Sequence, residues 1–187
     1  MEKKYDSFRL VLGNIADFNG DSIVVPCWSN LGTGNVISDA INERLKIQGA
    51  RPVEFEPWRL DHEKDYPLFS AHYAKTNKLQ GVDSIILAAC YVDEDEKEFS
   101  TPFYLRAAKT TANVLEVANA NQVNSIAFPA YMTGQQRGAI DQIVPAMLDE
   151  FQRHHRAGRM PKDISLYLFD LNDFNTSLEI AKHKLRK

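Results

Sequence analysis

Apolar residues along this chain fall into short continuous runs that alternate with amphipathic segments. The runs have no polar face, which is typical of strands buried on both sides of a sheet. They predict strands over 8–16, 22–28, 83–91, 124–130 and 164–170. A weaker alternating pattern predicts one more strand over 68–76.

Between these runs, apolar residues recur at helical spacing. The spacing predicts helices over 35–46, 102–120, 138–155 and 173–185. In the helix over 102–120, the residues expected to face the core are Leu105, Ala108, Ala112 and Leu115. Alternating strands and helices favour an α/β fold. We therefore expect a single domain, residues 1–187, built as a three-layer α/β/α sandwich with a mixed, largely parallel sheet.

The stretch 47–67 is the longest irregular segment and contains three prolines. Irregular segments of this length are either surface excursions or lids over a site. Both interpretations stay open at the level of sequence.

Composition and charge narrow the class of protein. The chain has 187 residues, of which 44 % are hydrophobic, and this is long enough to bury a sizeable core. A net charge of −3 gives no general attraction to nucleic acid or to a membrane surface. The two cysteines form no CxxC pair, and the first residues contain no apolar targeting segment. We expect a cytoplasmic monomer with no membrane or nucleic-acid partner.

Two glycine-containing loops are the candidates for a binding site. In sheets of this type, ligands bind outside the carboxyl ends of the strands. The loops Gly32–Asn35 and Thr133–Gly138 follow predicted strands there and lead into helices. Each can offer backbone N–H groups and the positive end of a helix dipole, so two of them suit two linked phosphates. Both can equally be ordinary strand-to-helix turns.

Other sequence signatures argue against several kinds of chemistry. The segment GTGNVI has Ile37 where a dinucleotide fingerprint needs a small residue, and no P-loop or Gly-x-Ser-x-Gly elbow occurs. The five histidines lack metal-ligand spacing, so we expect no metal and no cofactor. Cys27 and Cys90 are interpreted as small buried residues rather than nucleophiles, because neither has a base nearby in the sequence.

The order of these motifs resembles that of macro domains. SIAFPAYMTGQQRG is similar to their strand and second phosphate loop, and LGTGNVISDAI resembles their first phosphate loop in its shorter form. GNIADFNGDSIVVPCWSN and DSIILAACY resemble two further strands of the family. The resemblance covers nearly all of residues 8–180. Macro domains bind ADP-ribose, and some remove it from proteins or cleave related esters.

The resemblance implies a set of ligand-binding residues. It places the diphosphate between two groups of residues: Gly32, Thr33, Gly34 and Asn35 on one side, and Thr133, Gly134, Gln135, Gln136, Arg137 and Gly138 on the other. It places adenine near Asn14 and Ile15, with Phe169 available for stacking. The other residues expected to contact the ligand are Cys27, Trp28, Ser29 and Val36.

The chain also departs from the family's pattern. Asn14 stands where the family has the Asp that contacts the adenine amino group, although an Asn can both accept from and donate to adenine. Pro26–Trp28 replaces the end of an Asn-Ala-Ala-Asn stretch, and Gln135–Gln136 replaces an aromatic residue beside the distal ribose. Asp39 is the candidate carboxylate for orienting a hydrolytic water, with helix capping as its other interpretation.

Three functions remain open. The first is binding of ADP-ribose or a related nucleotide, with an ADP-ribosylated protein as a further partner. The second is hydrolysis of an ADP-ribosyl linkage with the help of Asp39. The third is a module of the same fold that binds another nucleotide, an RNA end or a protein.

Overall fold

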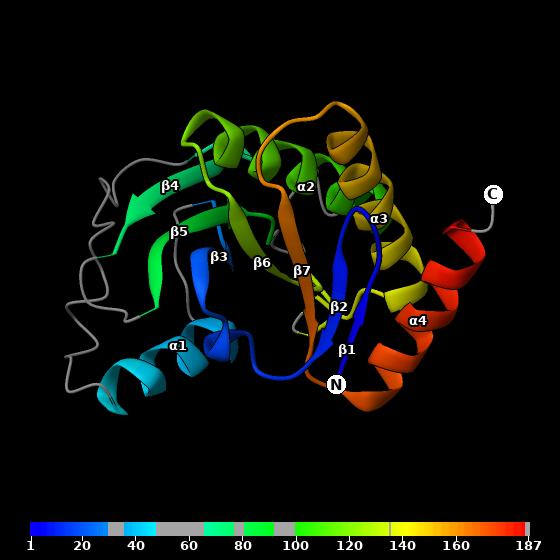
Figure 1. The fold of residues 1–187 in the computed structure, drawn as a ribbon, viewed down its shortest axis with the longest axis horizontal. Helices are drawn as coiled ribbons and strands as arrows, with labels where there is room; N and C mark the ends of the chain where they lie inside the picture. The colour runs from blue at the N-terminus through cyan, green and yellow to red at the C-terminus, as the bar shows by residue number, and fades with distance from the viewer. Residues whose placement is uncertain (30–35, 48–65, 77–80, 92–99, 135, 186–187) are drawn as a thin grey trace.

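A computed structural model describes residues 1–29, 36–47, 66–76, 81–91, 100–134 and 136–185. Their strands form one seven-stranded sheet in the order β1-β2-β7-β6-β3-β5-β4 (Figure 1). The strands are β1 Glu2–Lys4, β2 Arg9–Leu12, β3 Gly20–Cys27, β4 Ala71–Lys75, β5 Val82–Ala89, β6 Ser125–Pro129 and β7 Asp163–Leu168. The five inner strands are parallel, and only the edge strands β1 and β4 pair antiparallel with their neighbours.

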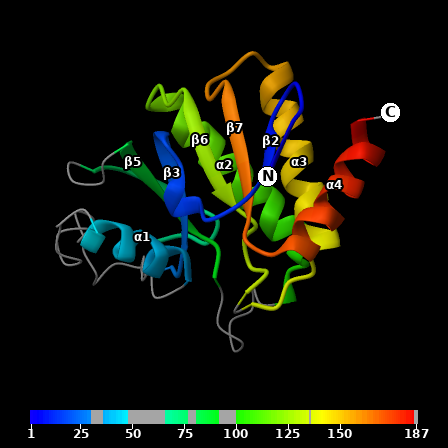
Figure 2. The same ribbon diagram turned by 60° about the horizontal axis from the view of Figure 1, so that its bottom comes forward.

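Helices cover both faces of this sheet. They are α1 Val36–Ile47, α2 Phe103–Ala120, α3 Ile140–Arg156 and α4 Leu171–Leu185, and a short 3-10 helix, η1, spans Ile15–Asp17. Helices α2, α3 and α4 lie on one face, and α1 and η1 lie on the other (Figures 1 and 2). The predicted three-layer α/β/α arrangement with a mixed, largely parallel sheet is confirmed.

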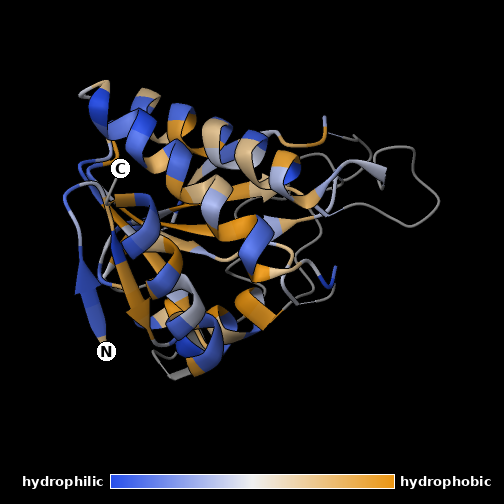
Figure 3. Cartoon of the chain, turned by 90° about the vertical axis from the view of Figure 1, so that its right-hand side faces the viewer, coloured by the Kyte–Doolittle hydropathy of each residue, from blue (hydrophilic) through white to orange (hydrophobic). Residues whose placement is uncertain are grey.

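The inner strands pack apolar side chains on both faces, as their continuous hydrophobic runs predicted. Val24, Ile86 and Phe128 belong to the core beneath α2, α3 and α4. Their neighbours Ile23 and Ile85 belong to the opposite core, beneath α1 and η1. Figure 3 shows these inner strands as hydrophobic, while β1 at the sheet edge is hydrophilic.

The predicted strand over 8–16 is shorter than expected. Strand β2 ends at Leu12, and the Asn14 side chain accepts a hydrogen bond from the backbone N–H of Ala16, which begins η1 instead. A side-chain cap of this kind offers the backbone an alternative to the strand ladder. Strand β1 is an addition that the polar sequence Glu2–Lys4 did not predict.

The buried face of α2 also differs from the predicted one. Leu105 is 40 % exposed, whereas the polar residues Arg106, Thr110 and Thr111 are buried. The buried arc of α2 is set by the positions of α3 and the sheet, between which the helix packs. Apolar spacing alone did not locate this arc, because polar side chains occupy part of it.

Two sequence expectations concern residues on which the structure gives partial information. Residues 48–65 of the irregular segment 47–67 lie outside the described residues, so the choice between a surface excursion and a lid stays open. Among the helices that the structure describes, none is long and apolar enough to cross a membrane.

Candidate functional site

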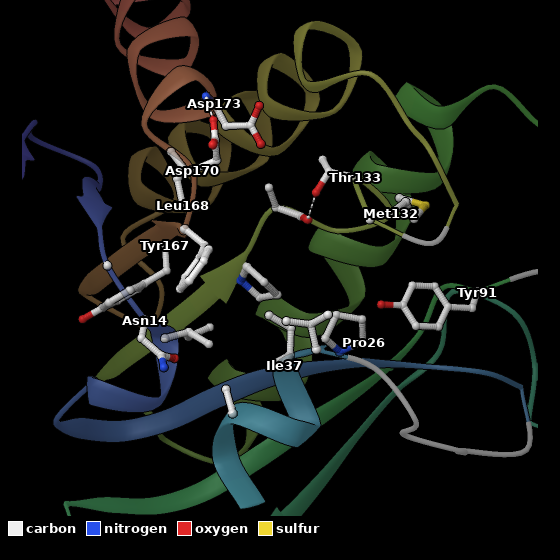
Figure 4. Close-up of a pocket in the computed structure, with 18 residues that line it drawn as sticks. Asn14, Pro26, Ile37, Tyr91, Met132, Thr133, Tyr167, Leu168, Asp170 and Asp173 are labelled. Atoms are coloured by element: carbon white, nitrogen blue, oxygen red, sulfur yellow. Dashed lines mark hydrogen bonds between the residues drawn. The ribbon is translucent and has the colours of Figure 1, made fainter. Parts of the chain in front are cut away.

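A cavity of about 280 Å³ opens at the carboxyl ends of the parallel strands (Figure 4). Its walls come from residues at or just after the ends of β2, β3, β6 and β7, together with the first two turns of α1, Tyr91 after β5 and Asp173 of α4. This is the edge of the sheet where α/β folds place their ligands, because the loops that leave parallel strands converge there.

One end of the cavity combines an amide with aromatic rings. Asn14 of the β2–η1 connection lies beside Tyr167 of β7 (Figure 4), and Ile15, the first residue of η1, also lines the cavity. Phe169, directly after β7, also lines the cavity although its side chain is 83 % exposed. An aromatic face open to solvent at the mouth of a cavity can stack on a planar ligand without first being uncovered.

Two carboxylates of the cavity wall, those of Asp170 and Asp173, lie at the start of α4. Asp170 caps this helix, because its Oδ1 accepts hydrogen bonds from the backbone N–H groups of Asn172 at 2.7 Å and Asp173 at 3.2 Å. Burial, followed by the nearby charge of Asp170, raises the pKa of Asp173. Among the described lining residues these two acids are the charged ones, and none is basic.

The opposite end of the cavity is formed by Tyr91 and the loop that follows β6. In that loop Thr133 and Gly134 line the cavity, and the Thr133 hydroxyl donates to the carbonyl of Ala130 at 3.0 Å (Figure 4). The Gly138 backbone N–H donates to the Met132 carbonyl at 2.8 Å and so closes the loop.

This loop adopts an unusual backbone conformation. Met132 has φ of 61° and Arg137 has φ of 53°, both in the left-handed region that non-glycine residues rarely enter. Gly138 is buried, and a Cβ built there would lie 2.6 Å from Ile143 Cδ1 and 3.1 Å from the Met132 carbonyl oxygen. Gly138 is therefore required for packing against α3, rather than for access to the cavity.

Tyr91 is supported from behind by an aromatic neighbour. The Trp28 and Tyr91 rings form an edge-to-face pair with centroids 5.4 Å apart. Tyr91 lines the cavity, whereas Trp28 does not. Burial raises the pKa of Tyr91, so its hydroxyl remains protonated and able to donate a hydrogen bond.

The structure brings six of the residues expected to bind a ligand into the lining of this one cavity. They are Asn14, Ile15, Val36, Thr133, Gly134 and Phe169. A second group of expected residues does not line the cavity: Cys27, Trp28, Ser29, Gln136, Arg137 and Gly138. The remaining ones, Gly32, Thr33, Gly34, Asn35 and Gln135, lie outside the described residues.

Three residues are considered for catalysis from the sequence, Cys27, Cys90 and Asp39, and the structure describes the surroundings of each. Cys27 and Cys90 are fully buried; burial raises the pKa of Cys27 well above its ordinary value and that of Cys90 to about 12. Neither thiol is available as a thiolate near neutral pH. Asp39 is exposed on the first turn of α1, whose cavity-facing residues are Val36, Ile37 and Ala40. In the part of the chain that the structure describes, no group of three or more His, Cys, Asp or Glu side chains could hold a metal ion.

Sequence reasoning overlooked several residues of the cavity. Tyr167 and Asp173 line it, as do Ile37 and Ala40 of α1. The pair Asp170 and Asp173 carried a usable signal, because an acid three residues after an Asp is typical of a capped helix start. No comparable local signal indicates Tyr167, which lies one residue inside the strand end.

Comparison with known proteins gives a clear result for the fold. No family sequence model matches the chain, and no curated protein matches it in sequence. Among solved structures, an Oceanobacillus iheyensis macrodomain mutant is similar with a TM-score of 0.80 and 16 % identity, over 100 % of this chain and 97 % of the other. A second mutant of that macrodomain, with ADPR, has a TM-score of 0.79 and 18 % identity, over 100 % and 99 % of the two chains.

A macrodomain from Trypanosoma brucei in complex with ADP-ribose is also similar. Its TM-score is 0.71 at 16 % identity, over 94 % of this chain and 69 % of the other. The protein therefore has the macrodomain fold, with a sequence far removed from those of its structural neighbours.

Proposed function

We propose that the protein binds ADP-ribose, or a closely related nucleotide that contains ADP-ribose, in the cavity at the carboxyl ends of the strands. The observation that carries the proposal is that the two ends of one cavity differ in chemistry. Asn14, Ile15 and Phe169 offer an amide and an open aromatic face at one end, and Thr133 and Gly134 offer a closed backbone loop at the other. A purine suits the first end, and phosphate and ribose groups suit the second.

The solved neighbours support the same ligand class, because two of them contain ADPR or ADP-ribose in the same fold. We extend the proposal to an ADP-ribosylated protein as a physiological partner, and to a cytoplasmic, monomeric, single-domain protein. We do not extend it to hydrolysis, because Asp39, the carboxylate favoured by the sequence, is not on the described cavity wall.

Calorimetric titration tests the proposal, with ADP-ribose as ligand and AMP as the comparison. We expect ADP-ribose to bind at least about tenfold more tightly than AMP, because only ADP-ribose reaches both ends of the cavity. A purified, folded protein that releases no heat with ADP-ribose would refute the proposal.

A matched pair of variants at Gly134 tests the position of the site. Gly134 lines the cavity, and a Cβ built there meets no atom within 4 Å. Gly134→Ala should therefore bind ADP-ribose nearly as the native protein does. Gly134→Glu brings a bulky anion beside the phosphates and should weaken binding at least about tenfold while the unfolding midpoint stays unchanged. Equal affinity in both variants would place the ligand elsewhere.

A further inference from the structure

Arg106 is the largest side chain in the described part of the protein that is fully buried, with 1 % of its surface exposed. It lies in the first turn of α2. Its Nη2 donates to the carbonyl of Cys90 at 2.9 Å and to Oε1 of Gln136 at 2.7 Å. One nitrogen thus joins the chain just after β5 to the loop after β6.

No described carboxylate pairs with this cation. The groups against it are the Cys90 carbonyl, the Gln136 amide and the Phe103 ring, whose centroid lies 5.1 Å from the guanidinium carbon. Its Nε is buried without a hydrogen-bond partner. Burial lowers the pKa of Arg106, but a guanidinium remains protonated in proteins. A buried charge without a carboxylate partner, as Arg106 is among the described residues, destabilises the folded state, so its presence calls for a reason other than stability.

Both hydrogen-bond partners of Arg106 belong to segments that form the cavity wall. Tyr91 follows Cys90 and lines the cavity, and Thr133 and Gly134 lie in the same loop as Gln136. That loop holds two non-glycine residues in the left-handed region, a conformation that the surrounding structure must enforce. The bond from Arg106 to Gln136 is one such constraint.

The charges on the cavity wall also favour a role for Arg106 in ligand binding. The charged groups on its described wall are Asp170 and Asp173, which would repel an anionic ligand. A diphosphate in the cavity therefore needs positive potential from behind the wall. Arg106 contacts the segments that form this wall and has no carboxylate partner among the described residues, in an environment where electrostatic interactions are weakly screened.

We propose that Arg106 is a positioning residue for the phosphate groups of the ligand: it holds the loop Thr133–Gly138 through Gln136, and from behind that loop it supplies the cation that the diphosphate compensates. This inference rests on the proposed function. It predicts that one substitution weakens binding of ADP-ribose and leaves binding of adenosine unchanged, which a purely structural role does not.

The first test replaces Arg106 by Met and by Gln. Arg106→Met removes the charge and keeps a long apolar stem, but it leaves the Cys90 carbonyl and Gln136 Oε1 without their donor, so the unfolding midpoint without ligand should stay equal or fall. ADP-ribose affinity should fall at least about tenfold, and adenosine affinity should stay within about twofold. Arg106→Gln keeps a hydrogen-bonding group without the charge, and it carries the test if the Met variant does not fold. Lys109→Met is the matched control, since it removes an exposed charge from the same helix and should change neither affinity.

Two results would overturn the inference: ADP-ribose affinity that is unchanged in both Arg106 variants, or equal losses for ADP-ribose and adenosine, which would indicate collapse of the cavity. Inorganic pyrophosphate separates this inference from the proposed function. Binding of pyrophosphate but not ADP-ribose by the native protein, with loss of pyrophosphate binding in the Arg106 variants, would refute the proposed function alone. A native protein that binds neither probe would refute both.

Discussion

The side-chain Oδ1 of Asn14 accepts a hydrogen bond from the backbone N–H of Ala16 at 2.9 Å, and this bond begins η1 at one end of the cavity. The same side chain lines the cavity. Asn14 therefore has a structural role that is independent of any ligand, and a substitution there acts on stability and on binding by separate routes.

Two substitutions of Asn14 test its structural role. Asn14→Ala removes the capping acceptor and should lower the free energy of unfolding by about 1 kcal/mol. Asn14→Asp keeps an acceptor and should stay within about 0.5 kcal/mol of the native protein. Urea unfolding measures both values. Equal stabilities for the two variants would mean that the hydrogen bond to Ala16 contributes nothing.

Phe169 offers a test of aromatic stacking that does not disturb the core. Its side chain is 83 % exposed, so Phe169→Ala should leave the unfolding midpoint unchanged. Loss of a ring that stacks on a base costs about 1–3 kcal/mol, so affinity for ADP-ribose should fall about fivefold or more. Calorimetry with Phe169→Ala and Phe169→Trp measures this, and the Trp variant should retain binding.

Leu171 provides the matched control for Phe169. It lies two residues further on, is 52 % exposed and does not line the cavity. Leu171→Ala should therefore bind ADP-ribose as the native protein does. Similar losses in the Phe169 and Leu171 variants would point to a general effect on the start of α4, rather than to stacking.

The burial of Cys27 and Cys90 predicts unreactive thiols. Burial raises the pKa of both, and thiol reagents attack the thiolate. At about pH 8, where a free cysteine is partly ionised, the native protein should react very slowly and the urea-unfolded protein rapidly, with two equivalents of reagent. Fast stoichiometric labelling of the native protein would contradict the buried positions of these side chains.

The buried position of His154 predicts that the folded protein loses stability as the pH falls. Its side chain is buried on α3, its ring Nε2–H donates to the carbonyl of Met160, and burial lowers its pKa. The unfolded chain binds a proton at about pH 6.5, whereas the folded protein binds it only at lower pH, so protonation favours unfolding. The stability held by neutral His154 is fully present above about pH 6.5 and is lost as the pH falls below that value.

Thermal unfolding at about pH 7.5 and about pH 5 measures this contribution. His154→Gln should show a smaller drop in the unfolding midpoint between the two pH values than the native protein does. His155→Gln is the matched control, because the neighbouring His155 is exposed. A native-like drop in the His154 variant would assign the pH dependence to other groups.

Local patterns predicted the elements well where one kind of interaction dominates. The run Ile85–Ala89 has no polar residue, so a doubly buried strand is the conformation that removes it from water. The predictions failed where side chains act through distant partners. The prediction that Leu105 faces the core was wrong, because the neighbouring position Arg106 is the buried one and finds its hydrogen bonds on other segments.

The sequence by itself determined the α/β class, the buried strands and the loops at which a ligand is expected, because hydrophobic runs, helical spacing and glycine turns act over a few residues. Only the tertiary structure decided which polar groups meet. The contacts of Arg106 with Cys90 and Gln136 depend on the strand order β6-β3-β5, which brings together segments far apart in the chain. The apolar pattern does not encode that order, since the same strands could bury the same hydrophobic surface in several arrangements.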